Sequence, residues 1–144
     1  MSRLLMTVAM LAGTLACNVA TAHEIKIKDF EFIHPWTREP GSGVKDLPIY
    51  MVLRNMASTE DHIVAASSPF AMKGELRAGK PEGGGQVTAI QIAGNATVEL
   101  SVDRPHIQLS GLTEPLEGYQ YFPLILTFER SGQIEIEVYV EEPN

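Results

Sequence analysis

Apolar and polar residues alternate in steps of two through most of the chain after residue 22. Because a period of two places neighbouring side chains on opposite faces, this pattern indicates β-strands with one buried face. The clearest case is the segment 133–140, whose apolar positions are Ile134, Ile136, Val138 and Val140. The pattern predicts strands at residues 24–33, 49–53, 63–66, 73–78, 87–92, 97–102, 122–129 and 133–140, the first as one long strand.

Short glycine-containing segments separate these strands, at residues 40–43, 81–85, 94–95, 117–118 and 131–132. Such segments favour tight turns, and nothing after residue 22 has convincing helical periodicity. The sequence therefore predicts an all-β fold, a β-sandwich of Greek-key type. Residues 23–144 make up 122 of the 144, which suits a single domain with its own core.

Residues 1–22 have the three parts of a secretory signal peptide. Arg3 supplies the positive start, residues 4–16 are apolar, and Ala20-Thr21-Ala22 forms an A-x-A cleavage site. We therefore expect a periplasmic protein whose first mature residue is His23. The alternative is a lipoprotein acylated at Cys17, in which His23 would be internal. The residues before Cys17 match that signal poorly, because a leucine normally stands three positions ahead of the cysteine.

Charge and composition exclude several classes of function. The chain has 11 Lys and Arg against 18 Asp and Glu, so its net charge of −7 argues against binding to nucleic acid phosphates. No apolar run after residue 22 approaches the ~20 residues that a membrane span requires. The sequence contains neither a nucleophile elbow nor a phosphate-binding glycine loop, so we do not expect an enzyme.

A histidine at the mature N-terminus offers an α-amine and an imidazole to the same metal ion. With one further imidazole it would form a histidine brace, a three-nitrogen site that suits copper. His106 is the best candidate for the third nitrogen, and Asp103 is a candidate oxygen ligand in the same segment. His34 is a further candidate. A straight strand would put it roughly 30 Å from His23, so it could join His23 only if residues 23–26 folded back or a bulge intervened. It could instead meet His106 if the loop before His106 lies at the same end of the sandwich.

Several segments along the chain form a recognisable series, namely 33–38 (IHPWTR), 50–55 (YMVLRN), 65–71 (AASSPFA), 97–100 (TVEL), 105–112 (PHIQLSGL), 115–118 (PLEG) and 124–129 (LILTFE). Together they resemble the PCu(A)C family of periplasmic copper chaperones. The resemblance extends over residues 25–140 and implies a cupredoxin-like sandwich that carries Cu(I). A brace of His23 and His106, with Asp103 nearby, also resembles the Cu(II) site of CopC-type copper proteins.

The chain departs from that family at the copper ligands. The resemblance implies a histidine, a methionine and a histidine-x-methionine pair, of which only His106 is present. Arg77 replaces the first histidine, Gln108 replaces the last methionine, and the other methionine maps to Thr88 or Gly84. Because thioether sulfur favours Cu(I), its loss predicts a nitrogen-rich site that favours Cu(II), with Cu(I) as the alternative.

Two functions of different classes follow from these observations. The first is a periplasmic copper-binding or copper-chaperone protein, with a copper ion, a membrane copper enzyme or another copper carrier as partners. The second is a metal-free module of the same fold that assists the assembly of a copper enzyme. A histidine brace also occurs in lytic polysaccharide monooxygenases, but a chain this short without a flat aromatic face does not suit that chemistry.

Overall fold

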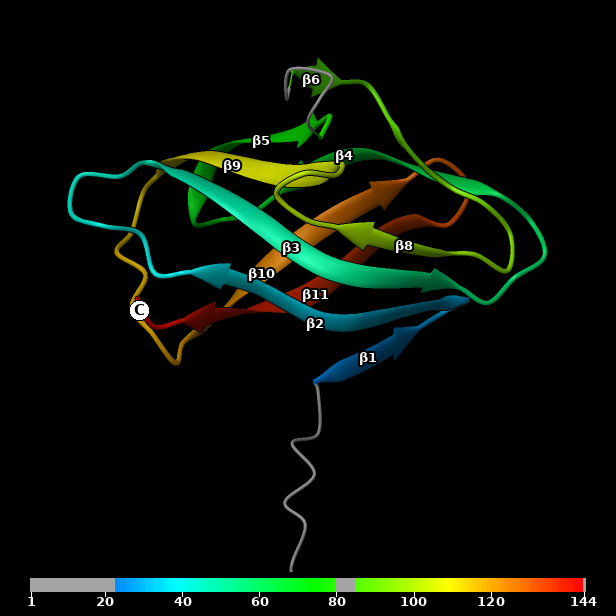
Figure 1. Ribbon diagram of the computed structural model, residues 1–144, viewed down its shortest axis with the longest axis horizontal. Helices are drawn as coiled ribbons and strands as arrows, with labels where there is room; N and C mark the ends of the chain where they lie inside the picture. Colours follow the sequence, from blue (N-terminus) through cyan, green and yellow to red (C-terminus); the bar gives the residue numbers. More distant parts are fainter. Residues whose placement is uncertain (1–22, 80–84, 144) are drawn as a thin grey trace, which may run out of the picture.

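The computed structural model describes residues 23–79 and 85–143, and every regular element in these ranges is a β-strand (Figure 1). The predicted signal peptide lies outside the described residues. The strands are β1 (Glu24–Ile27), β2 (Phe30–Arg38), β3 (Asp46–Asn55), β4 (Asp61–Ser67), β5 (Ala71–Arg77), β6 (Gln86–Val87), β7 (Ile90–Ile92), β8 (Thr97–Leu100), β9 (His106–Leu112), β10 (Tyr121–Phe128) and β11 (Gly132–Glu141). The predicted all-β sandwich is confirmed. No helix in these ranges is long and apolar enough to cross a membrane.

The strands are hydrogen-bonded in the order β6-β5-β9-β3-β2-β11-β10-β4-β7, while β1 pairs with β2 and β8 pairs with β3. Every described pair is antiparallel except β2 with β11, which run parallel at Trp36–Tyr139, Thr37–Val140 and Arg38–Glu141. Strands from the two ends of the chain therefore lie side by side. The sheet folds over itself, and β10 and β11 cross behind β2 and β3 in Figure 1.

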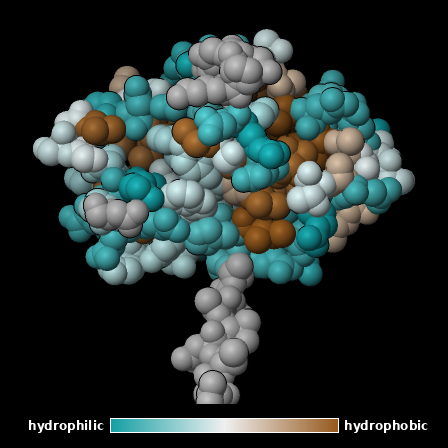
Figure 2. All heavy atoms as spheres, viewed as in Figure 1, coloured by the Kyte–Doolittle hydropathy of each residue, from teal (hydrophilic) through white to brown (hydrophobic). Residues whose placement is uncertain are grey.

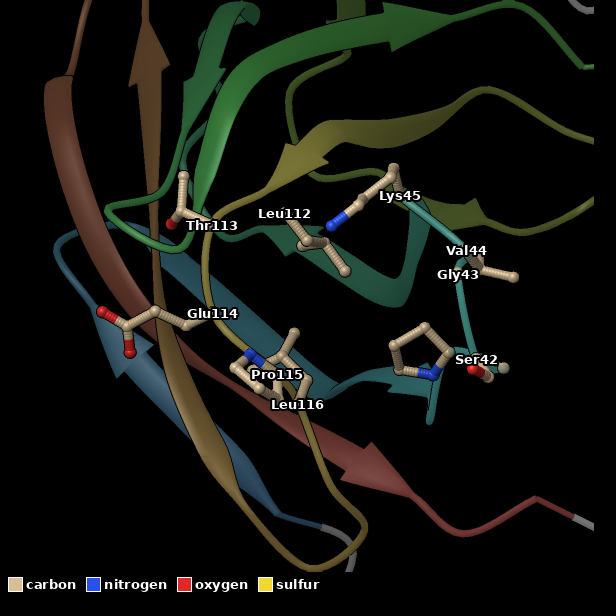
Figure 3. A pocket seen from close by; sticks show the side chains of 11 residues that line it. Ser42, Gly43, Val44, Lys45, Leu112, Thr113, Glu114, Pro115 and Leu116 are labelled. Atoms are coloured by element: carbon tan, nitrogen blue, oxygen red, sulfur yellow. The ribbon is translucent and has the colours of Figure 1, made fainter.

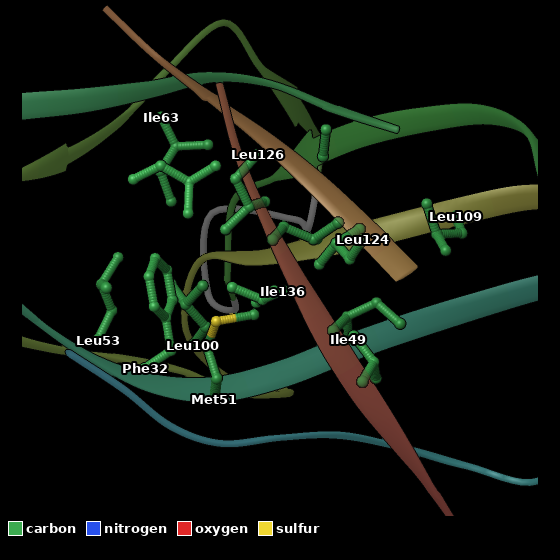
Figure 4. Close-up of a cluster of buried hydrophobic side chains, with 14 of the residues drawn as sticks. Phe32, Ile49, Met51, Leu53, Ile63, Leu100, Leu109, Leu124, Leu126 and Ile136 are labelled. Atoms are coloured by element: carbon green, nitrogen blue, oxygen red, sulfur yellow. The ribbon is translucent and has the colours of Figure 1, made fainter. Parts of the chain in front are cut away.

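The core lies between the folded parts of the sheet and is built from the apolar positions of the alternation. Phe32, Met51, Leu100, Leu126 and Ile136 meet there from five different strands (Figure 4). The prediction for 133–140 is confirmed, because its four apolar residues are at most 2% exposed. This burial fixes the opposite face of β11 as the outer face of the sheet.

The predicted single strand at 24–33 is wrong, because the chain reverses at Lys28 and Asp29. Lys28 adopts φ 55°, and β1 folds back along β2 with Glu24 opposite Ile33. Two consecutive polar residues, one of them a turn-favouring aspartate, interrupt the apolar alternation at this point. The result is a hairpin, and it brings residue 23 next to residue 34.

The sequence analysis also missed β9, whose residues were assigned to no strand. Ile107 and Leu109 are fully buried, and β9 lies between β3 and β5. Gly111 has φ 69°, so the regular alternation lasts only about four residues before the backbone departs from it. The predicted strand at 87–92 is interrupted too, forming β6 and β7 on opposite edges of the sheet.

Candidate functional site

The β1–β2 hairpin places His23 beside His34. The backbone N–H of His34 donates a hydrogen bond of 2.7 Å to the carbonyl oxygen of His23, one step beyond the Glu24–Ile33 pair. The His23 side chain is exposed, and its ring centroid lies 5.7 Å from that of Tyr121. Two of the predicted ligands, distant in a straight strand, are therefore neighbours.

His34 occupies an irregular position in β2. The register with β3 shifts between Ile33 and Trp36, and His34 adopts φ 47°, in the left-handed region that few side chains occupy. Its Nε2 lies 3.0 Å from Oε1 of Glu141, the last residue of β11. Such backbone conformations are often found at functional sites, and a carboxylate on one ring nitrogen orients the other.

His106 and Asp103 lie together elsewhere on the sheet. His106 begins β9 directly opposite Arg77 of β5, and its Nδ1 lies 3.0 Å from the Arg104 carbonyl oxygen. If Nδ1–H donates this bond, the tautomer leaves Nε2 unprotonated. Asp103 is exposed in the loop before β9. Burial raises the pKa of the Tyr50 phenol above its ordinary value. The positive charge of Arg38 lowers this pKa and the negative charge of Asp103 raises it, so the Asp103 carboxylate is close enough to Tyr50 to affect its phenol.

A row of aromatic rings connects these two pairs. Tyr121 is opposite Tyr139, Tyr139 is opposite Trp36, and Trp36 is opposite Tyr50. Tyr50 follows the Ile49–Ile107 pair, so its cross-strand neighbour is His106, with ring centroids 5.9 Å apart. We call Tyr121, Tyr139, Trp36 and Tyr50 the aromatic row.

The predicted histidine ligands thus lie at different points along the aromatic row. The His23 ring lies beside Tyr121, the His34 ring lies between Tyr139 and Trp36, and the His106 ring lies beside Tyr50. His23 directly precedes β1, which pairs with β2, so three inter-strand spacings of about 4.8 Å each, or roughly 14 Å, separate its strand from β9. The described structure therefore does not bring His23 and His106 together.

Within residues 23–79 and 85–143, no three His, Cys, Asp or Glu side chains are grouped closely enough to hold a metal ion. His62 is bracketed by two carboxylates, with Nδ1 3.1 Å from Glu129 and Nε2 3.4 Å from Glu60. These carboxylates face different edges of the ring and do not converge on one point.

The family model described as "Putative lipoprotein LpqE-like" matches residues 31–140, well over half of the chain. The chain belongs to the LpqE-like family. No curated protein matches it significantly. The fold of this LpqE-like protein is that of PCuAC domains, as the resemblance in the sequence predicted.

Three solved structures illustrate the similarity. The apo PCuAC domain from PmoF1 superposes with a TM-score of 0.77 at 21% identity, covering 84% of this chain and 100% of the domain. The copper-bound PCuAC domain from PmoF2 gives 0.75 at 22%, covering 84% and 99%. The Cu(I) form of DR1885 from Deinococcus radiodurans gives 0.67 at 22%, covering 88% and 85%.

In this LpqE-like protein, the positions that the resemblance assigns to copper ligands hold other chemistry. Arg77 lies directly opposite His106, and Gln108 lies opposite Glu75. The Arg77 guanidinium remains positively charged and lies 3.3 Å from Glu75, which also pairs with Lys73. Thr88 is exposed between β6 and β7, and Gly84 lies outside the described residues. The cationic Arg77 replaces one donor here and Lys73 adds a second positive charge nearby, which disfavours a metal cation.

Shallow grooves run along the same face as the aromatic row. One of 290 Å³ lies beside His34 and is lined mainly by apolar residues, including Ile33, Val52 and Val102. Figure 2 shows apolar surface gathered over β3 and β8 in this region. A second groove, of 430 Å³, begins on the other side of Trp36 and Tyr50. It continues into a pocket between loops 40–45 and 112–116 (Figure 3).

Several residues of this face escaped the sequence analysis. Glu141 was not considered a partner of His34, because nothing in the sequence indicated that β2 and β11 are parallel neighbours. Tyr139 stands between the apolar positions Val138 and Val140 of the predicted alternation, which puts it on the outer face, and that alternation was the one available sign of the aromatic row. The other rings come from strands whose order the sequence does not reveal.

Proposed function

We propose that this LpqE-like protein is an extracytoplasmic copper-binding protein whose site forms at the mature N-terminus, from His23 and His34. The observation that carries the proposal is the 2.7 Å hydrogen bond from the His34 N–H to the His23 carbonyl. It makes the two histidines neighbours on one exposed edge. The copper-bound PCuAC domain of PmoF2 and Cu(I)-DR1885 support copper as the ligand of this fold.

Cleavage before His23 would complete the donor set. The α-amine and imidazole of His23 supply two nitrogens, and the His34 imidazole supplies the third. Because the amine is not a side chain, this set is compatible with the absence of a three-side-chain cluster in the described ranges. Amine and imidazole nitrogens suit Cu(II) better than thioether-containing sites do, so Cu(II) is the favoured state and Cu(I) the alternative.

Glu141 acts on this site through His34. Its carboxylate binds Nε2, which leaves Nδ1 of His34 as the nitrogen directed to copper. Outer-shell carboxylates of this kind orient a ligating imidazole and raise its basicity, and their loss typically lowers metal affinity about 10–100-fold. The protein binds and carries the ion in this account, and it is not an enzyme.

A brace completed by His106, with Asp103 as an oxygen ligand, is the competing arrangement. The separation along the aromatic row and the cationic Arg77 beside His106 argue against it. The two arrangements are distinguished by isothermal titration with Cu(II), using His34→Ala and the matched control His106→Ala. We expect the first variant to lose affinity by more than the roughly 10–100-fold typical of an outer-shell partner. The control should bind like the native protein, and the opposite result would assign the site to His106.

The location of the protein depends on how the leader is processed. Cleavage after Ala22 exposes His23, whereas acylation of Cys17, the single cysteine, leaves His23 internal. The LpqE-like family is described as lipoproteins, which gives the second route support that the sequence alone did not. The intact mass of the protein isolated from its native host separates the two. The copper proposal requires a chain that begins at His23.

A second candidate function is a metal-free interaction module that assists the assembly of a membrane copper enzyme. The grooves on either side of Trp36 and Tyr50 favour it, since exposed apolar surface of this kind commonly binds partners. A protein with this function would tolerate an extra residue before His23. It would also bind its partner equally well with and without copper.

A further inference from the structure

The aromatic row crosses four neighbouring strands, β10, β11, β2 and β3, and the His34 imidazole completes its line of ring contacts. Ring centroids are 5.1 Å apart for Tyr121–Tyr139 and 5.2 Å apart for Trp36–Tyr50. Between these two pairs lies the His34 imidazole, 6.5 Å from Tyr139 and 6.3 Å from Trp36. All of these separations fall within the range of aromatic rings in contact.

The composition of the row is also unusual for an outer face. It contains the single tryptophan of the chain and three of its four tyrosines. None of the four rings is fully buried, and Tyr121 is 49% exposed. Indole and phenol are the side chains most easily oxidised by one electron without a metal. The fold therefore collects nearly all such groups into one line of contacts.

We propose that the aromatic row is an electron-transfer path, along which a one-electron oxidation that begins at one ring moves to the others. The oxidant is a one-electron acceptor from solution, such as a radical derived from peroxide. It gains one electron from Trp36, whose indole then releases its N–H proton to water. A neighbouring tyrosine returns an electron and a proton to Trp36 and becomes the neutral phenoxyl radical.

The ends of the path differ in their surroundings. Tyr50 is half-buried, so less water reaches its phenol to accept a proton. Tyr121 is the most exposed ring of the row, and water can accept its proton directly. The oxidised site should therefore settle at Tyr121, next to His23. These steps need no metal, so a failed copper titration would leave the path intact.

Pulse radiolysis of the metal-free protein tests the path, because azide radicals oxidise tryptophan first and Trp36 is the only one. In the native protein we expect the indolyl radical to convert to a tyrosyl radical at a rate independent of protein concentration. The matched control is Tyr119→Phe, since Tyr119 lies in the turn before β10 rather than on a strand. It should convert like the native protein.

The decisive variant replaces Tyr50, Tyr121 and Tyr139 with phenylalanine and leaves Tyr119 as the only tyrosine. We expect it to retain the fold, as measured by circular dichroism, and to lose the intramolecular conversion. Conversion at the native rate in this variant, or concentration-dependent conversion in the native protein, would overturn the proposal. If the triple variant does not fold, Tyr50→Phe and Tyr139→Phe are compared singly, and each must slow conversion more than Tyr119→Phe does.

Discussion

The backbone at His34 provides a sharp prediction, because its φ of 47° has opposite consequences for alanine and glycine. This left-handed conformation costs a residue with a Cβ about 1–2 kcal/mol of folding free energy, and glycine avoids that cost. Glycine loses about 0.5–1 kcal/mol of unfolded-state entropy relative to alanine in a strand. His34→Gly should therefore be more stable than His34→Ala by about 0.5–1 kcal/mol. Both variants lose the contacts to Glu141 and Trp36, so these cancel in the comparison.

An exposed residue in a regular strand serves as the control. At Glu137 of β11, glycine should be less stable than alanine by about 0.5–1 kcal/mol, so the sign reverses between the two positions. Urea unfolding of the four variants measures this, with midpoint shifts at constant slope reporting stability. A glycine that is less stable than alanine at both positions would refute the strain at His34. It would also remove one reason to regard this histidine as retained for binding.

Three further predictions follow from the described contacts. Asp61 is buried, and although burial raises its pKa, hydrogen bonds from the Ser131 hydroxyl and three backbone N–H groups lower it overall. The ionised Asp61 carboxylate therefore stabilises the fold fully at pH values above the pKa that Asp61 has in the unfolded chain. This stabilisation is lost as the pH falls through the lower pKa that Asp61 has in the folded protein. Asp61→Asn should cost about 3 kcal/mol at neutral pH by chemical denaturation and flatten the acid limb of the stability profile. Gly94→Ala would put a Cβ 2.1 Å from a backbone oxygen, so melting should show a severe loss of stability. The double variant Arg77→His with Gln108→Met should gain Cu(I) binding in a competition titration, because it restores two donors beside His106. No gain would show that the side chains at these positions do not converge on one metal ion.

Much of the fold could be predicted because the alternation of apolar and polar residues indicates which side chains are buried. Segments such as 133–140 have an unbroken period of two, and their apolar residues form the core. The misses occurred where that period is short or interrupted. Gly111 ends the regular part of β9 early, and Lys28 and Asp29 turn the chain where a continuous strand was expected.

The candidate site was less predictable, because it depends on which strands are neighbours. His23 and His34 were recognised individually, but their proximity follows from a two-residue turn between β1 and β2. Glu141 reaches His34 because β2 and β11 are parallel neighbours, although the two residues are 107 positions apart in sequence. Periodicity assigns a residue to a face, but it does not give the order of strands across that face.

The most direct test of copper binding at the mature N-terminus is a Cu(II) titration followed by electron paramagnetic resonance. One sample begins at His23, as verified by intact mass, and the other carries one additional residue before it. The account predicts one-to-one binding with nitrogen hyperfine structure in the first sample and its loss in the second. Equal binding in both samples, or none in the first, would contradict a site built on the amine of His23.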